Sequence, residues 1–444
     1  MKTAISFKTI NRLAVPATIA GIAEPVLSIT DTAIVGNIPE YGVESLAAVG
    51  IVGSFLSMLI WILGQTRSAI SAIISQYLGA HRLKEVSTLP AQAIYFNIGL
   101  SLIILLTTFF AAEWIFKLFN AQDRILSFSV SYYRIRVWGF PLTLFVFAVM
   151  GIFRGLQNTF WPMIIALVGA GLNIVLDFLL VYGVTDILEP MYLEGAAWAS
   201  LIAQSVMAIM AFILLISKTD MSLKLKFPLN VEFLRLVGMT FNLFIRTVAL
   251  NITLILAVRE ATALGDSYIG AHTIAINLWL FAAFFIDGYG AAGNIMGGRL
   301  LGAKDYSGLW KLMKKICLYG AMVSGVLLVL GFILYQPLGR IFSSDAEVLN
   351  TFYSIFYLVI LALPVNAIAF VLDGLFKGLG EMKFLRNVLL LATFIGFIPS
   401  LFLGKYLDLG LHGIWIAITV WMLIRGAALW WKFNQKFRPF LQKG

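Results

Sequence analysis

The chain has 444 residues, of which 60% are hydrophobic and 12% charged, with a formal net charge of +10. Soluble domains carry about 25% charged residues, so this composition excludes a soluble enzyme and a disordered chain and indicates a protein that crosses a membrane many times. Cys317 is the one cysteine of the sequence, which excludes a disulfide scaffold.

Hydropathy predicts an all-α polytopic membrane protein with twelve spans. A transmembrane helix needs about 20 mostly apolar residues, and the apolar stretches here lack the alternation of a β-barrel strand. In chain order the predicted spans cover residues 10–35, 46–78, 90–112, 126–150, 160–183, 194–217, 232–263, 268–301, 311–335, 347–376, 384–404 and 410–431.

The basic residues of the loops predict the orientation. With twelve spans both termini lie on one side, and 22 of the 32 Lys and Arg residues fall on that side, against four in the opposite loops. Because positive charge marks cytoplasmic loops, we expect both termini to be cytoplasmic and the protein to lie in the cell (inner or plasma) membrane. This asymmetry accounts for the net charge, so no nucleic-acid partner is expected.

The sequence repeats itself once. GIFRGL at 151–156 returns as GLFKGL at 374–379, 223 residues later. The same offset relates Pro141 to Pro364 and QYLGA at 76–80 to RLLGA at 299–303. Near the end the offset falls to 218, where GAAWA at 195–199 matches GIWIA at 413–417. One register shared by several matches indicates two homologous halves.

The repeat predicts two six-helix lobes. Since six spans return the chain to the same side, the lobes are parallel repeats related by a pseudo-two-fold axis along the membrane normal. We expect an N-lobe at 1–217, a cytoplasmic linker at 218–231 and a C-lobe at 232–444. Transporters with this organisation bind substrate between the lobes and work by alternating access.

The ionisable residues well inside the predicted spans are all acids. They are Glu24, Asp31, Asp177, Asp287 and Asp373. Ionisable groups are costly in hydrocarbon, by about 2.5–3.5 kcal/mol on insertion scales, so each one is a candidate functional residue. Acids facing a cavity suit a transported cation, whether an organic base, a sodium ion or a proton.

Asp31 and Asp177 are the foremost candidates for a cation site. Asp177 follows Asn173 by four residues, which places both side chains on one helical face. Asp31 follows Pro25, which is expected to bend its helix. Together these residues can form a cluster that binds a proton or a sodium ion. A purely structural hydrogen bond is the alternative for all five acids.

Other motifs exclude further chemistry. GYGAAG at 288–293 lies inside an apolar span without a preceding strand, so helix packing explains its glycines better than phosphate binding. Gly151, Gly155, Gly374 and Gly378 likewise form GxxxG packing pairs. No Walker motif and no histidine pair with metal-ligand spacing occurs in the sequence. We therefore expect no enzyme activity, no cofactor and no metal beyond a possible sodium ion.

Several segments resemble the MATE family of multidrug efflux transporters, and within it the DinF-like branch. They are AEPVLSITDTAIVG at 23–36, NIVLD at 173–177, LFIRTVALNITLILAVREATALG at 243–265 and AHTIAINLWLFAAFFIDGYG at 271–290. The resemblance implies an antiporter in which entry of protons, or alternatively sodium ions, drives the export of cationic amphipathic compounds. It also implies that cation binding bends the first helix near Pro25.

The resemblance implies roles for individual residues. Asp31, Asn173 and Asp177 carry the N-lobe cation cluster, and Ser200 takes a position where relatives often have threonine. In the C-lobe, the stretch that corresponds to the glutamate of the NorM branch reads FIRT at 244–247, with Arg246 nearby and no acid, so a C-lobe sodium site is not expected. Asn294 replaces a second acid of some DinF-like relatives. Glu24, Asp287 and Asp373, with Arg246 and Asn294, are left as candidates for the substrate cavity.

Two other functions compete with cation-coupled export. A lipid-linked oligosaccharide flippase of the same superfamily would use a cationic cavity, for which Arg67, Arg134, Arg136 and Arg246 are available. An intramembrane enzyme would need a motif such as DDxxD or HExxH, which the sequence lacks. As a transporter the protein is expected to act as a monomer among membrane lipids.

Overall fold

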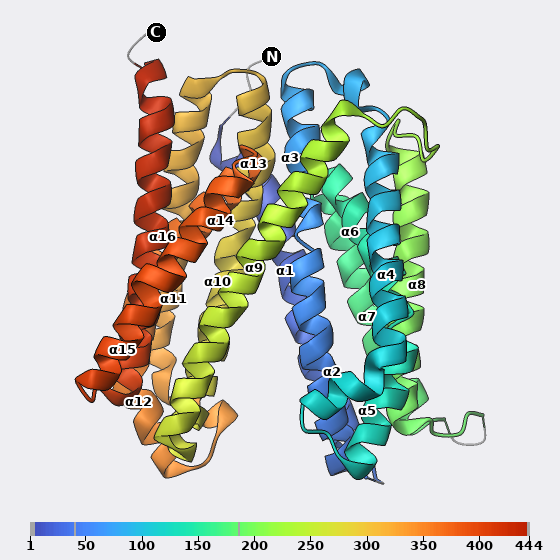
Figure 1. The fold of residues 1–444 in the computed structure, drawn as a ribbon, viewed down its shortest axis with the longest axis vertical. Helices are drawn as coiled ribbons and strands as arrows, with labels where there is room; N and C mark the ends of the chain where they lie inside the picture. Colours follow the sequence, from blue (N-terminus) through green and yellow to red (C-terminus); the bar gives the residue numbers. More distant parts are fainter. Residues whose placement is uncertain (1–4, 40, 185–186, 442–444) are drawn as a thin grey trace. The chain divides into compact units, whose positions relative to one another are not determined.

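The computed structural model describes residues 5–39, 41–184 and 187–441, with only the backbone of Glu24 and Ser28. The described residues form α-helices joined by short loops (Figure 1). The helices are α1 (Phe7–Gly36), α2 (Gly42–Leu63), α3 (Thr66–Gly79), α4 (Leu89–Leu118), α5 (Asp123–Arg136), α6 (Gly139–Gly155), α7 (Phe160–Tyr182), α8 (Tyr192–Lys218), α9 (Val231–Leu264), α10 (Asp266–Gly302), α11 (Tyr306–Phe342), α12 (Ala346–Leu361), α13 (Leu363–Gly378), α14 (Met382–Leu391), α15 (Ile398–Tyr406) and α16 (Gly410–Leu441). A 3₁₀ turn, η1 (Leu83–Val86), precedes α4, and a π-helical turn, η2 (Ala392–Phe397), joins α14 to α15.

The described helices provide the twelve predicted spans. Ten helical segments are long and apolar enough to cross a membrane, among them Gly42–Gly79, which contains α2 and α3, and Met382–Tyr406, which contains α14, η2 and α15. Two more spans are bent pairs, α5 with α6 and α12 with α13. The prediction of an all-helical, twelve-span protein is confirmed.

The two bent spans occupy equivalent positions in the repeat. The bend is 46° between α5 and α6 and 52° between α12 and α13. Pro141 lies in the first turn of α6, and Pro364 lies in the first turn of α13, 223 residues later. Proline has no N–H group to donate and its ring crowds the preceding turn, so the first turn after a break accommodates it best.

The chain divides into two compact units. The first, here the N-unit, comprises Ile19–Ile74 and Arg82–Val237. The second, here the C-unit, comprises Met1–Thr18, Ser75–His81 and Gly238–Gly444. Helices α1, α3 and α9 each contribute residues to both units. The lobe boundaries at 217 and 232 remain a prediction from the repeat.

Aromatic side chains pack together in the core of the N-unit. Phe55 of α2, Phe116 of α4 and Tyr133 of α5 are buried, and their ring centroids lie 5.3 to 6.0 Å apart. The Tyr133 hydroxyl also hydrogen bonds with Thr108 Oγ1 of α4, at 2.5 Å. The rings therefore fix α5 against α2 and α4, which positions the residues that follow Tyr133 on α5.

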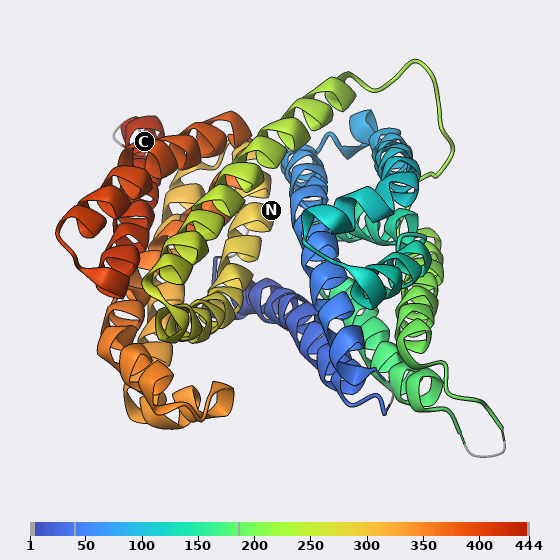
Figure 2. The same cartoon turned by 60° about the horizontal axis from the view of Figure 1, so that its bottom comes forward.

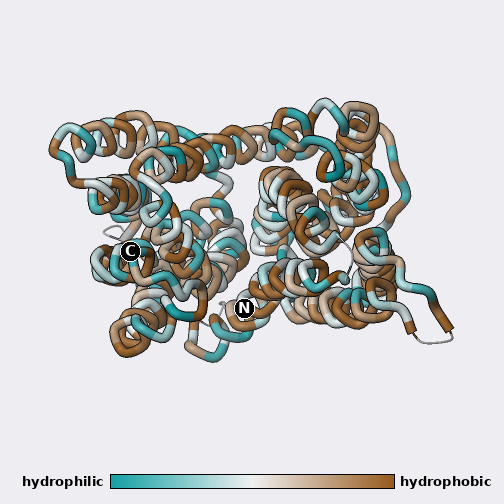
Figure 3. Tube along the Cα trace, turned by 90° about the horizontal axis from the view of Figure 1, so that it is seen from below, coloured by the Kyte–Doolittle hydropathy of each residue, from teal (hydrophilic) through white to brown (hydrophobic). Residues whose placement is uncertain are grey.

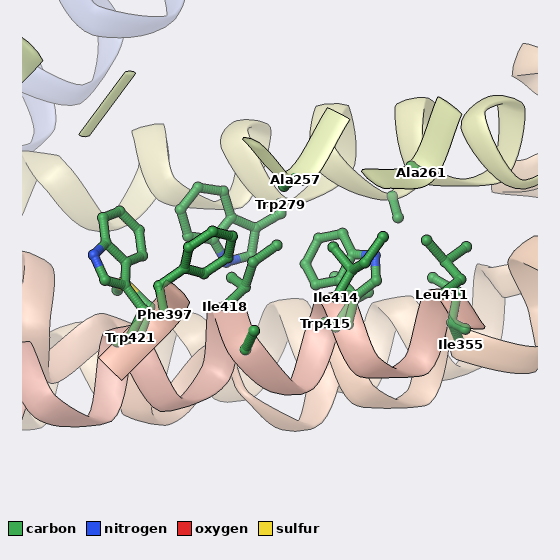
Figure 4. Packing of buried hydrophobic residues seen from close by; sticks show 14 of the residues in the cluster. Ala257, Ala261, Trp279, Ile355, Phe397, Leu411, Ile414, Trp415, Ile418 and Trp421 are labelled. Atoms are coloured by element: carbon green, nitrogen blue, oxygen red, sulfur yellow. The ribbon is translucent and has the colours of Figure 1, made fainter. Parts of the chain in front are cut away.

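A layer of tryptophans forms part of the core of the C-unit. Trp279 of α10 and Trp415 and Trp421 of α16 are buried among aliphatic side chains (Figure 4). The small residues Ala257 and Ala261 of α9 face this layer and let the helices approach closely.

The GxxxG pairs are points of close helix packing in both units. A Cβ atom on Gly374 or Gly378 of α13 would collide with the backbone of Gly290 or Asn294 of α10. In the N-unit, a Cβ atom on Gly151 of α6 would collide with the Arg67 carbonyl group of α3. The packing interpretation of these glycines and of the GYGAAG stretch is therefore confirmed.

The QYLGA and RLLGA stretches pack against each other within the C-unit. A Cβ atom on Gly79 would collide with the Arg299 carbonyl group, and one on Gly302 would collide with the Gln76 carbonyl group. These two contacts are equivalent under the 223-residue offset. Gln76 Nε2 also donates a hydrogen bond to the Gly378 carbonyl oxygen at 2.8 Å. The ends of α3, α10 and α13 thus meet, and the contacts between α3 and α10 involve positions that the internal repeat relates to each other.

Large hydrophobic side chains remain exposed on the helices, as lipid contact requires. Examples are Ile103 and Phe110 of α4, Ile395 of η2 and Phe402 of α15. Figure 3 shows hydrophobic residues along the helices of both units. The chain is therefore a multi-span membrane protein.

The segment between α8 and α9 has no helix over residues 219–230 and runs as an extended loop (Figure 2). It is tied to the N-unit, because Gln92 Nε2 donates to the Lys226 carbonyl oxygen at 3.2 Å and Gln92 Oε1 accepts from the Asn230 backbone N–H at 2.9 Å. The loop lies within the segment 218–231, whose role as a cytoplasmic linker stays a prediction.

Candidate functional site

Four helices of the N-unit bring polar side chains together in its interior. Asp31 comes from α1, Arg136 from α5, Asn173 and Asp177 from α7, and Ser200 from α8. We call these five residues the cation cluster. Asp31, Asn173, Asp177 and Ser200 are buried, so the predicted coupling residues share one desolvated location.

Asn173 connects the cluster along and between helices. Its Nδ2 donates a hydrogen bond to Asp177 Oδ2 at 2.7 Å, one helical turn further along α7. Its Oδ1 accepts a hydrogen bond from Ser200 Oγ at 3.3 Å. The spacing of four residues on α7 therefore places both side chains on one face, as the sequence indicated.

The carboxyl groups of Asp31 and Asp177 lie within hydrogen-bonding reach of each other. Ionised carboxylates only accept hydrogen bonds, so the pair needs a shared proton or a bound cation between its oxygens. Asp31 Oδ1 and Asp177 Oδ1 are buried and accept no hydrogen bond from any described residue. These two oxygens are the available ligand atoms of the cluster.

Contacts further along α7 and α1 hold this pair in place. The Tyr182 hydroxyl at the end of α7 donates a hydrogen bond to the Ile34 carbonyl oxygen of α1 at 2.8 Å. Ile34 is three residues from Asp31, and Tyr182 is five residues from Asp177. The bond therefore fixes the distance between α1 and α7 near the two acids.

Arg136 and Tyr132 belong to this environment, and the sequence argument did not assign them to it. The positive charge of Arg136 acts on both Asp31 and Asp177. Its guanidinium carbon lies 5.9 Å from the centroid of the buried Tyr132 ring, one turn earlier on α5. The signal in the sequence was an arginine inside a predicted apolar span, but spacing alone does not identify its partners on other helices.

The oxygen atoms of the cluster suit a proton or a small hard cation. Two carboxylates, the Asn173 amide oxygen and the Ser200 hydroxyl are all oxygen donors, which are the ligands that hard cations prefer. With both acids ionised, the cluster would have two negative charges from the acids and one positive charge from Arg136. One monovalent cation therefore neutralises the cluster.

The C-unit holds a second buried charged cluster with a different composition. Asp373 of α13 forms ion pairs with Arg246 Nη2 of α9 at 2.5 Å and with Lys377 Nζ of α13 at 3.1 Å. Arg425 Nη2 of α16 lies 3.8 Å from Asp373 Oδ1. We call these four residues the Asp373 cluster. Asp373 is thus surrounded by protein cations, and Arg246 pairs with it directly.

Asp287 and Asn294 are the other acidic or amide candidates whose side chains the structure describes. The Asp287 side chain of α10 is exposed and makes no ion pair or hydrogen bond with another described residue. Asn294 is buried where α10 packs on Gly378. The side chain of Glu24 lies outside the described residues. Pro25 lies within α1, which is helical on both sides of it.

Comparison with known proteins relates the whole chain to one family. The MatE family model matches residues 16–179 and again residues 241–402. One model matching each half agrees with the internal repeat.

Relatives and solved structures extend over nearly the full length. Protein DETOXIFICATION 44, chloroplastic, of Arabidopsis thaliana is 29% identical over 97% of this chain and 83% of its own. DNA damage-inducible protein F of Escherichia coli (strain K12) is 26% identical over 96% of this chain and 92% of its own. A crystal structure of MATE in the bent conformation has the same fold, with a TM-score of 0.90 and 19% identity over 98% of this chain and 96% of that one.

Proposed function

Since the chain belongs to the MatE family, whose members are membrane transporters, we propose that it is a secondary active exporter of amphipathic organic cations that works by antiport with protons or sodium ions. The observation that carries this proposal is the buried Asp31 and Asp177 pair, whose Oδ1 atoms have no described hydrogen-bond partner. Buried charges are normally paired or bound to a cation.

The charge of the cation cluster supports coupling to one monovalent cation. Without a bound cation the cluster retains one unbalanced negative charge in a buried location, which is costly. With a proton or a sodium ion it is neutral. The two states therefore differ by one charge, and a gradient of that cation across the membrane can drive one state toward the other.

Helix α1 is the element through which we propose that cation binding changes the protein. Residues Phe7–Thr18 of α1 belong to the C-unit, whereas the part from Ile19 to Gly36, with Asp31, belongs to the N-unit. Pro25 lies within the N-unit part, between its start at Ile19 and Asp31, and removes one backbone hydrogen bond of the helix. A local bend at Pro25 would respond to whether Asp31 holds a cation.

The membrane orientation is part of the same proposal. The basic residues of the loops support cytoplasmic termini in the inner or plasma membrane. The exported molecules would then leave the cytoplasm as protons or sodium ions enter it. We propose that a monomer is sufficient, because each chain contains both halves of the repeat.

The test is efflux of ethidium from proteoliposomes that contain the purified protein, with a pH gradient and a sodium gradient imposed separately. Wild type should export ethidium under one of the two gradients, and Asp31→Asn should lose at least 90% of this activity. Asp123→Asn is the matched control, because it makes the same change at an exposed residue of the N-unit. Equal efflux by wild type and Asp31→Asn would contradict the proposal.

A lipid-linked oligosaccharide flippase is the second candidate. The Asp373 cluster favours it, since three cationic side chains surround one carboxylate. Binding of a pyrophosphate lipid, without binding of ethidium, would support the flippase over the exporter.

A further inference from the structure

The Asp373 cluster contains more positive than negative charge. Arg246, Lys377 and Arg425 converge on the single carboxylate of Asp373, and no other acid pairs with them among the residues that the structure describes. Arg246, Asp373 and Arg425 are buried, and Lys377 is 14% exposed. The cluster therefore holds two surplus positive charges.

The dipole of α13 offsets only part of this surplus positive charge. Lys377 lies in the last turn of α13, where the carbonyl end of the helix carries about half a negative charge. More than one positive charge is left at a depth where isolated charges are expensive. An anion bound between the side chains would balance it.

The two arginines have donor groups that Asp373 does not use. Arg246 Nε is buried and donates to no described residue. Arg425 Nη1 contacts Met422 Sδ at 3.1 Å, a weak acceptor, while its Nη2 is 3.8 Å from Asp373. The planar guanidinium fork suits a carboxylate or phosphate group that accepts two hydrogen bonds.

Aromatic rings border the cluster on one side. The Arg425 guanidinium carbon lies 4.6 Å from the Trp421 ring centroid and 5.7 Å from that of Phe370. Phe370 in turn lies 5.6 Å from Trp279. Trp421 and Trp279 belong to the layer drawn in Figure 4. Phe370 is partly exposed, so a ligand with an aromatic ring beside its anionic group could contact Phe370 as well as Arg425.

The internal repeat shows that two charges of this cluster have no counterpart in the first half of the chain. The 223-residue offset relates Asp373 to Met150, and the 218-residue offset relates Arg425 to Met207. The N-unit thus forms the corresponding helices with apolar side chains at these positions. Lys377 corresponds to Arg154 and is basic in both halves, so the charges specific to the C-unit at these positions are those of Asp373 and Arg425.

We propose that the Asp373 cluster binds the carboxylate or phosphate group of an aromatic solute. The role of this site rests on the proposed export function, because binding there would add compounds with an anionic group to the exported substrates. Binding itself is measurable without transport, so the two proposals can fail separately.

The experiment measures thermal unfolding of the purified full-length protein in a non-ionic detergent free of lipid phosphate. The probes are 2-naphthoate, inorganic phosphate and, as the cationic counterpart, 2-naphthylmethylammonium. Ligands that bind only the folded state raise its Tm. We expect naphthoate to raise the Tm of wild type, and Arg425→Gln to weaken naphthoate binding at least tenfold.

Two controls separate binding from general effects. Arg386→Gln removes a partly exposed positive charge of the C-unit whose guanidinium contacts Asn387, so naphthoate binding should be unchanged. Asp31→Asn should keep naphthoate binding even where it abolishes efflux. Loss of efflux in Asp31→Asn with retained naphthoate binding would support the anion site. Efflux by wild type without naphthoate binding would overturn the anion site and leave the export proposal standing.

A second variant keeps the test informative if Arg425→Gln does not fold. Asp373→Asn removes the internal carboxylate, so its Tm should fall in anion-free buffer and recover on addition of naphthoate. Recovery with phosphate but not naphthoate would assign the site to a phosphate group, and a pyrophosphate lipid tested in the same way would identify a lipid source. No Tm change with any anion, or an equal change in Arg425→Gln and Arg386→Gln, would overturn the proposal.

Discussion

Arg136 supplies the positive charge that leaves the cation cluster with one unbalanced negative charge. Its charge acts on both Asp31 and Asp177 from the neighbouring helix α5. In the proposed coupling, we expect the arginine to set how strongly the two acids hold a cation. Asn173 and Ser200 act differently, because they orient the carboxylate of Asp177 and supply neutral oxygen atoms.

Replacing Arg136 by glutamine should make the bound cation harder to release. The two carboxylates would keep their full charge without a nearby counter-charge, so we expect at least a tenfold lower efflux rate together with tighter cation binding. Efflux and ion titration of the reconstituted variant check this. Arg134→Gln is the control, because Arg134 is exposed on the same helix. Faster efflux in Arg136→Gln would contradict the assigned role.

The cation cluster was predictable from the sequence only in part. Asn173 and Asp177 share a helical face by their spacing, and Asp31 is an acid within an apolar span. The approach of α1 to α7 depends on tertiary packing, such as the Tyr182 contact with Ile34, which spacing does not encode. The place of Arg136 and Tyr132 in the cluster was not predictable, because spacing along α5 does not reveal contacts with residues of α1 and α7.

Among the helices, the spans were predictable because a long apolar stretch in a membrane can satisfy its backbone hydrogen bonds only as a helix or within a closed barrel. The breaks within them were not. Hydropathy treated 126–150 and 347–376 as single spans, whereas the structure bends each one. The apolar composition continues through both breaks, so hydropathy does not detect them. The π-helical turn η2 is invisible to hydropathy for the same reason.

The crossing of α10 and α13 gives a prediction at this scale. A Cβ atom on Gly374 would overlap the backbone of Gly290, which does not move without shifting the helix. Overpacking costs about 1–3 kcal/mol, so Gly374→Ala should lower the free energy of unfolding by about that amount. Thermal unfolding in detergent measures the change.

Gly325 of α11 provides the control for this substitution. A Cβ atom there meets no atom within 4 Å, so Gly325→Ala should be neutral or stabilising by about 0.5–1 kcal/mol through its helix propensity. If Gly374→Ala and Gly325→Ala had the same Tm, close packing at Gly374 would not limit stability.

At the scale of the whole molecule, the two halves share a backbone plan but differ in polar content. The 223-residue offset relates Asp31 to Leu254 and Arg136 to Val359, both apolar. The cation cluster of the N-unit and the Asp373 cluster of the C-unit are therefore each present once. In this account coupling belongs to the N-unit, and the C-unit adds a site of opposite charge.

In the proposed antiport, substrate binding releases one cation that the Asp31 and Asp177 pair holds. The most direct measurement is cation release when ethidium is added to purified protein in weakly buffered solution, followed with a pH indicator and, separately, with radioactive sodium. We predict release of about one proton or one sodium ion per wild-type chain and none from Asp31→Asn. Equal release from both proteins, or none from wild type while ethidium binds, would contradict the account.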